Sequence, residues 1–208
     1  MGFFVMVTRV EPLHAVEVRV LGALIEKDIT TPEYYPLTVN SLQNACNQKS
    51  SRDPVVQYDE RTVEQALELL KTKHLVVRIS GAGHRVEKFG HRMGETLNLG
   101  RREMALLCVL MLRGPQTVGE LRGRTERMHD FADLEEVERV LETLEKSALV
   151  ARASRGRWVQ LLGGVVEVED SQPAAVARTP LEERVTSLER EIERLKQQLQ
   201  EKLGESFD

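Results

Sequence analysis

The chain contains an internal repeat, and this feature constrains its fold more than any other. The apolar stripe of residues 63–70 recurs 74 residues later, in 137–144. The stretch Leu-Val-Val-Arg at 75–78 also recurs 74 residues later, as Leu-Val-Ala-Arg. The Thr-Val-x-x-Leu pattern of 38–42 recurs 79 residues later. The two offsets differ by a deletion of five residues in a loop, where length is tolerated, so the repeat indicates duplication of one structural unit.

Each copy of the unit contains the signals of three helices. Residues 13–27 carry an apolar stripe at helical spacing, and the second copy repeats this stripe. Thr38 is the expected N-cap of a second helix over about 39–47, and Asp59 is that of a third helix. Thr62 offers the third helix an alternative start through a capping box.

A β-hairpin is expected after the third helix of each copy. In the first copy, the β-rich runs LVVRIS and RVEKF flank a Gly-Ala-Gly turn at 81–83. No helix starts after these glycines, so they predict a hairpin turn and not a phosphate loop. The second copy has a capping box at Thr117 and Glu120, a cap at Asp133 and a wing around 154–159. Three helices followed by a hairpin is the element order of a winged helix.

We therefore predict a mainly α-helical fold with small β wings, in which tandem winged-helix domains span residues 10–95 and 97–162. Residues 163–180 contain Gly, Pro and Ala without a sustained period and are expected to form a flexible linker. In 181–203 the apolar residues advance by four and three in turn, which is typical of a coiled-coil helix. This stripe consists of Leu181, Val185, Leu188, Ile192, Leu195 and Leu199.

The heptad stripe predicts a homodimer. Its a positions include two β-branched residues and its d positions are all leucine, a combination that favours a parallel two-stranded coil. Oppositely charged residues also face each other across such a pair, because Arg184 would meet Glu189 and Glu191 would meet Lys196 of the partner helix. The alternative is one amphipathic helix that packs onto the body of its own chain.

Charge and composition limit the classes of partner. The formal net charge of −4 exerts no general attraction on phosphate. The acidity is concentrated in residues 162–208, which contain 11 carboxylates and six cations, whereas residues 38–92 contain nine cations and six carboxylates. Residues 98–161 contain 11 cations and ten carboxylates, so the body of the protein is mildly cationic.

Other classes of protein lack support in the sequence. No apolar run is long enough to cross a membrane, and the N-terminal patch has no cationic leader, so we expect a cytoplasmic protein. The two cysteines cannot form a disulfide framework. His84 and His91 match no zinc spacing, and no cofactor motif is present, so we expect neither metal nor cofactor.

Cys46 lies in a polar stretch, Ala-Cys-Asn-Gln-Lys-Ser, that could hold a nucleophile. A catalytic thiolate needs a base, and no Cys–His motif is evident. On a helix over 39–47, Cys46 shares the inward face with Val39 and Leu42, which is the usual environment of a free cysteine. We therefore predict core packing for Cys46 and no enzymatic activity, with a thiol enzyme as the remaining alternative.

Two long stretches carry a family resemblance. They are LGALIEKDITTPEYYPLTVNSLQNACNQKSSRDPV at 21–55 and LRGPQTVGELRGRTERMHDF at 112–131. Over about residues 13–150 the chain resembles the YceH-like family of uncharacterised bacterial proteins. The resemblance implies tandem winged helices without an established biochemical role. The second wing, 154–159, departs from the Pro-Gly-containing pattern of these relatives, so a function located in that wing is not carried over.

A winged helix commonly places its third helix in the major groove of DNA. Here the third helices are mixed or acidic, and five glutamates of 134–147 oppose one arginine and one lysine. Cations occur instead in loops and wings, with Trp158 beside those of the second wing. The candidate nucleic-acid-binding residues are Lys49, Arg52, Arg78, His84, Arg85, Lys88, Arg122, Arg124, Arg127, Arg155 and Arg157.

The leading hypothesis is a regulator-like protein that binds double-stranded DNA through its backbone. The alternative is a protein–protein adaptor that uses the acidic third helices.

Overall fold

The structure is a computed structural model that describes residues 11–79 and 86–164. Both ranges belong to one compact unit. The heptad stripe of 181–199 and nearly all of the predicted linker lie outside the described residues, and so does the Gly-Ala-Gly turn at 81–83. The predicted coiled coil and the dimer therefore stay predictions.

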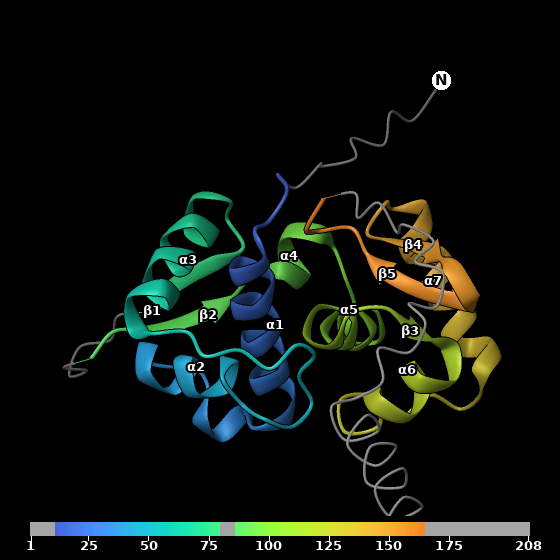
Figure 1. Cartoon of the computed structure of the whole chain (residues 1–208), viewed down its shortest axis with the longest axis horizontal. Coiled ribbons are helices and arrows are strands. Elements are labelled where there is room, and N and C mark those ends of the chain that lie inside the picture. Colours follow the sequence, from blue (N-terminus) through green and yellow to red (C-terminus); the bar gives the residue numbers. More distant parts are fainter. Residues whose placement is uncertain (1–10, 80–85, 165–208) are drawn as a thin grey trace, which may run out of the picture. The chain divides into compact units, whose positions relative to one another are not determined.

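The first half of the protein has the predicted order of three helices and an antiparallel hairpin (Figure 1). Its elements are α1 (Ala15–Thr30), a 3-10 turn at Pro32–Tyr34, α2 (Val39–Cys46), α3 (Glu60–Thr72), β1 (Val76–Ile79) and β2 (Lys88–His91). The side chains of Thr38 and Asp59 accept hydrogen bonds from the amides of Ser41 and Thr62. Asp59 is thus the cap of α3, and the alternative start at Thr62 is wrong.

Two boundaries in this half differ from the prediction. Helix α1 runs to Thr30 and not to residue 27, and it ends two residues before Pro32, whose ring cannot continue a helix. Strand β2 begins at Lys88, later than the predicted run at 85–89. Phe89 explains this register, because its backbone pairs with that of Leu37 and its side chain is buried.

The second half repeats the order with one strand added. Its elements are α5 (Arg101–Arg113), β3 (Gln116–Thr117), α6 (Val118–Thr125), α7 (Leu134–Lys146), β4 (Val150–Ala153) and β5 (Arg157–Gln160). The short β3 pairs with β5, which gives a three-stranded sheet in the order β3-β5-β4. Helix α4 (Met93–Leu97) joins the halves where the sequence suggested a domain boundary.

The predicted caps of the second half are confirmed. Thr117 accepts a hydrogen bond from the Glu120 amide at 3.3 Å, and the Glu120 carboxylate accepts one from the Thr117 amide at 2.9 Å. Asp133 accepts a hydrogen bond from the Glu136 amide at 2.7 Å, which starts α7. Each such cap typically stabilises a helix by about 1 kcal/mol.

Helices α1 and α5 form the centre of the molecule and pack against each other (Figure 1). The contact is close at Gly22, where an added Cβ would lie 3.0 Å from the Leu112 side chain. The Cys108 thiol lies 3.4 Å from the Gly22 carbonyl oxygen. Leu21, Leu24 and other leucines of the two helices are fully buried, and each stabilises the fold by roughly 1.5–3 kcal/mol. The two halves thus share one core.

Backbone hydrogen bonds also join the halves. The Leu13 amide donates to the Leu162 carbonyl at 2.7 Å, and the Asp53 amide donates to the Leu112 carbonyl at 2.9 Å. These contacts fix the start and the 47–54 loop of the first half against the second half. None of the helices that the structure describes is long and apolar enough to cross a membrane.

Candidate functional site

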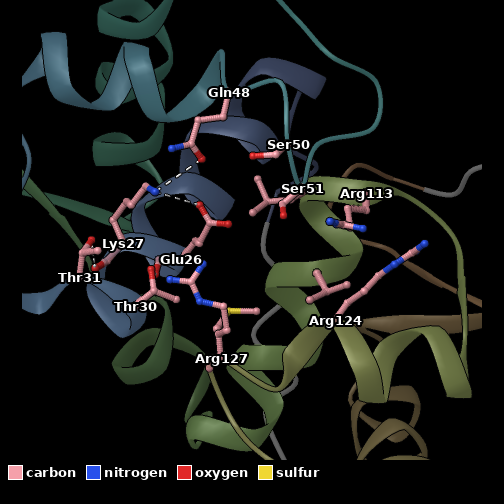
Figure 2. Close-up of a pocket in the computed structure, with 13 residues that line it drawn as sticks. Glu26, Lys27, Thr30, Thr31, Gln48, Ser50, Ser51, Arg113, Arg124 and Arg127 are labelled. Carbon is pink, nitrogen blue, oxygen red and sulfur yellow. Dashed lines mark hydrogen bonds and ion pairs between the residues drawn. The ribbon is translucent and has the colours of Figure 1, made fainter.

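A polar pocket of about 200 Å³ lies where the two halves meet (Figure 2). The C-terminal part of α1 forms one wall, the 47–52 loop a second, and the facing ends of α5 and α6 the third. The charged residues of its lining are Glu26, Lys27, Arg113, Arg124 and Arg127. The pocket is therefore cationic, and residues from both copies of the repeat build it.

The two stretches that carry the family resemblance meet at this pocket. Residues 21–55 and 112–131 supply every lining residue except Val109. From the sequence alone these stretches were assigned to separate units. The packing of α1 against α5 brings them together, so the pocket is a product of tertiary structure.

Arg52 differs from its predicted role as a surface cation. Its side chain is fully buried, and it donates two hydrogen bonds to the Glu26 carboxylate, at 3.0 and 2.6 Å. It also donates to the Ala45 carbonyl at the end of α2 and to the Gln48 side chain. Arg52 is thus unavailable to a nucleic acid, because its buried guanidinium links Glu26 of the pocket wall to the end of α2.

The Arg52 contact also neutralises Glu26. Burial alone would raise the pKa of Glu26, but the hydrogen bonds and charge of Arg52 outweigh it and hold that pKa below its ordinary value. Glu26 is therefore ionised at neutral pH. Because its charge is compensated by Arg52, Glu26 cancels little of the positive charge in the pocket.

The 47–52 loop is fixed by further contacts. Arg19 is buried and donates hydrogen bonds to the carbonyls of Cys46 and Pro54, at 3.3 and 2.6 Å. Asn47 is the C-cap of α2, with a φ of −89°. Its side chain exchanges two hydrogen bonds of 2.8 Å with the backbone of Tyr58. The loop is thus anchored at both ends.

The cations of the pocket are only weakly compensated. Lys27 Nζ lies 3.6 Å from a Glu26 oxygen and 3.5 Å from the Gln48 side-chain oxygen. Burial lowers the pKa of Arg113, and the charges of Arg124 and Arg52 lower it further. Figure 2 shows Arg127 extending from below toward Glu26 and Thr30 of α1. Positive charges from both halves therefore converge here.

Glu120 compensates the edge of the pocket. Its carboxylate lies 3.4 Å from Arg124 and 3.0 Å from Arg157. Arg157 also donates to the Pro115 carbonyl at 2.9 Å. The predicted wing cation Arg157 therefore has a structural contact, and Arg124 is partly neutralised.

The remaining predicted cations lie in different surroundings. Arg122 is exposed but donates to the carbonyls of Phe131 and Ala132. Arg78 pairs with Glu87 at 2.6 Å on the first hairpin, where Lys88 is half-buried. Arg155 is exposed in the tight turn of the second hairpin, while His84 and Arg85 lie outside the described residues.

The structure therefore brings together only part of the predicted set. Arg124 and Arg127 line the pocket, whereas Lys49 is exposed on the neighbouring 47–52 loop and does not line it. The first hairpin lies on the other side of the α1–α5 pair from α6 (Figure 1). Its cations are thus not part of the same surface.

The candidate residues predicted from the sequence do not include Lys27 and Arg113, which both line the site. Both lie in the last turn of a helix, where a cation ordinarily complements the helix dipole. Because this role is so common, the two cations did not indicate a site. The one available signal is that the first helix of each half carries a cation in its last turn. Trp158 was expected among exposed wing cations, but it is buried at 2% exposure under the Arg152 guanidinium.

The expected burial of Cys46 is confirmed. Burial raises the pKa of its thiol to about 12, and burial also raises the pKa of Cys108. We expect both thiols to react with a chromogenic disulfide reagent only as fast as the protein unfolds, because a thiol is nucleophilic as the thiolate. The measurement is the reaction rate at pH 7.5 with and without urea. Rapid modification of one thiol in the native protein, absent in a Cys46→Ser variant, would restore the thiol-enzyme hypothesis.

Metal-binding residues do not cluster in the part of the chain that the structure describes. Within residues 11–79 and 86–164, no group of three or more His, Cys, Asp or Glu side chains is arranged to hold an ion.

Comparison with known proteins identifies relatives over most of the chain. A family model described as "Protein of unknown function, DUF480" matches residues 13–157. A UPF0502 protein of Solibacter usitatus is 54% identical over 192 residues, which cover 88% of this chain and 93% of the relative. A UPF0502 protein of Opitutus terrae is 50% identical, over 88% of this chain and 83% of the relative. A UPF0502 protein of Serratia proteamaculans is 44% identical, over 90% of this chain and 94% of the relative. The resemblance to an uncharacterised bacterial family is confirmed: the chain belongs to the DUF480 family.

Proposed function

We propose that the protein is a cytoplasmic tandem winged-helix protein that binds double-stranded DNA, with regulator-like function. The repeated order of three helices and a hairpin supports the winged-helix assignment. One observation carries the DNA-binding proposal. Lys27, Arg113 and Arg127 gather at one pocket, where the carboxylates of Glu26 and Glu120 are already paired with Arg52 and Arg157.

The third helices do not support base recognition. The exposed face of α7 carries Glu135, Glu138, Glu142 and Glu145, and the last two of these pair with Arg152 at 3.8 and 4.0 Å. The negative charges of such a face repel the phosphates of DNA, whose binding instead needs Lys or Arg side chains that neutralise phosphates and release their counterions. The proposed complex therefore uses phosphate contacts around the pocket, which position the protein without specifying a sequence.

The heptad stripe of 181–199 favours a homodimer in this proposal. Two copies of the cationic surface would then be available to one duplex, and tethering would raise the apparent affinity without new contacts. The full chain is thus the appropriate material for binding experiments, and light scattering of the same sample measures whether it is a dimer.

The test is fluorescence anisotropy of a long duplex titrated with the full chain at low salt. We expect binding whose logarithmic affinity falls linearly with logarithmic salt concentration. The double variant R113Q/R127Q should weaken binding at least about tenfold and reduce the salt slope by roughly two, because each phosphate contact contributes about 0.9. The matched control is Arg139→Gln, which removes the same type of charge from the exposed face of α7.

The outcomes distinguish the sites. Binding that is lost in R139Q and kept in R113Q/R127Q would move the interface to α7. A folded chain that binds no duplex at micromolar concentration would contradict the proposal.

An adaptor function is the second candidate, and the surface of α7 favours it. This helix exposes Leu134, at 48%, beside its glutamates. A basic protein partner with an apolar contact would complement this face. A pull-down with the full chain tests this function. Recovery of one protein in stoichiometric amount, unaffected by nuclease treatment and lost with a Leu134→Glu variant, would support the adaptor function.

A further inference from the structure

Positive charges in the pocket repel one another, because too few carboxylates are present among its lining residues to compensate them. Among the described residues, Glu26 is the only carboxylate within ion-pair distance of Lys27, at 3.6 Å, and none lies within that distance of Arg113 or Arg127. Glu26 is itself held by two hydrogen bonds from Arg52. Lys27, Arg113 and Arg127 therefore share the site with one carboxylate that Arg52 has already neutralised. The remaining cation of the lining, Arg124, is paired with Glu120.

Two of these cations are also partly removed from water. The Lys27 side chain is only 20% exposed, and Arg113 is half-buried. Like charges repel more strongly where solvent is excluded, because the effective dielectric constant falls. The lowered pKa of Arg113, caused first by burial and then by Arg124 and Arg52, agrees with this repulsion. An anion in the pocket would relieve it.

The walls of the pocket are held in place before any ligand binds. Arg52 ties the 47–52 loop to Glu26 on α1, and the Asp53 amide ties the same loop to Leu112 on α5. Lys27 is therefore carried by the first half and Arg113 by the second, on helices that pack directly against each other. Because the backbone that carries these cations is already held in place, anion binding costs little backbone entropy.

Size and hydrogen-bonding groups limit the ligand. The volume of about 200 Å³ is below the roughly 300–1,000 Å³ of pockets that hold drug-sized molecules. Ser50 and Ser51 bring hydroxyl groups to the lining opposite Lys27 (Figure 2). The hydroxyls of Thr30 and Thr31 donate to the Glu26 and Lys27 carbonyls, so their protons are already used. Several donors and an excess of cations suit a small oxyanion.

We infer that this pocket is a binding site for one phosphate group, contacted by Lys27 of the first half and by Arg113 and Arg127 of the second. Guanidinium and ammonium groups are the side chains that bind phosphate oxygens most strongly. The phosphate can belong to a free ion or small phosphorylated molecule, or to the DNA backbone. The inference uses cations of the proposed DNA-binding surface but does not depend on DNA binding.

The experiment measures thermal unfolding of the full chain at pH 7.5, with inorganic phosphate or with chloride at equal ionic strength. We expect phosphate to raise the Tm of the wild-type protein in a saturable manner. A rise of about 5 °C or more is expected when phosphate exceeds its Kd a hundredfold. Arg127→Gln should abolish most of this rise, and since Arg127 is exposed, this substitution leaves the fold intact. The control R139Q should behave like the wild-type protein.

Two results would overturn the inference. One is a Tm that does not respond to phosphate, and the other is an equal response in wild type, R127Q and R139Q, which would show a general salt effect. Isothermal titration calorimetry with phosphate and separate anisotropy titrations with duplex DNA distinguish the two sources. Saturable phosphate binding without DNA binding keeps the inference and removes the proposed function. DNA binding without saturable phosphate binding keeps the proposed function and overturns the inference.

Discussion

Replacing Arg52 by methionine is expected to destabilise the protein by about 3–5 kcal/mol, because the substitution leaves the Glu26 carboxylate ionised and largely buried without its partner. The Glu26 side chain is 15% exposed and that of Arg52 is 0% exposed. The Ala45 carbonyl would lose its side-chain donor as well. Urea unfolding followed by circular dichroism measures the loss. Arg61→Met, on the exposed face of α3, is the matched control and should change stability by less than about 0.5 kcal/mol.

The double variant E26Q/R52M tests the physical reason for this loss. It removes both charges, so it should recover part of the stability that R52M alone loses. A loss of less than about 1 kcal/mol in R52M would show that Arg52 is not the buried anchor described above. Arg52 would then again be a candidate for contact with a nucleic acid.

Replacing Trp158 by alanine is expected to destabilise the protein by about 3–5 kcal/mol, since it removes a large buried side chain and leaves a cavity. Trp158 lies on β5, the central strand of the three-stranded sheet, where its backbone pairs with Gln116 and Arg152. Its ring also lies 4.4 Å from the guanidinium carbon of Arg152. Arg155→Ala in the adjoining exposed turn is the control and should have little effect on stability.

The same variant separates two roles for Trp158. A core residue reduces stability when it is removed, whereas a residue that stacks on nucleic-acid bases reduces affinity and leaves stability unchanged. Unchanged urea unfolding of W158A together with weakened binding to single-stranded DNA would therefore contradict the packing observed here.

Much of the fold could be predicted from local patterns. The apolar stripe of 63–70 and the cap at Asp59 are sufficient to place α3, and the repeat transfers the same assignment to α7. The inward face of α2 predicted the burial of Cys46. These features succeed because caps and helical periodicity depend on residues that are close in sequence.

The candidate site could not be predicted in the same way. Arg52 is polar, and a charged residue in a loop is ordinarily exposed, but its partner Glu26 lies one helix earlier and is met only after folding. Lys27 and Arg113 come from different copies of the repeat and meet only because α1 packs on α5. The donor groups of Arg122 and Arg157 are used by backbone carbonyls in other segments, 10 and 42 residues away in the sequence, which no local pattern reveals.

The close approach at Gly22 bears on whether either half could fold alone. A methyl group on Gly22 would lie 3.0 Å from the Leu112 side chain, so α1 and α5 pack closely here, and separating them would expose apolar surface to water. Either half produced alone would expose the apolar face of α1 or of α5, and we expect it to aggregate.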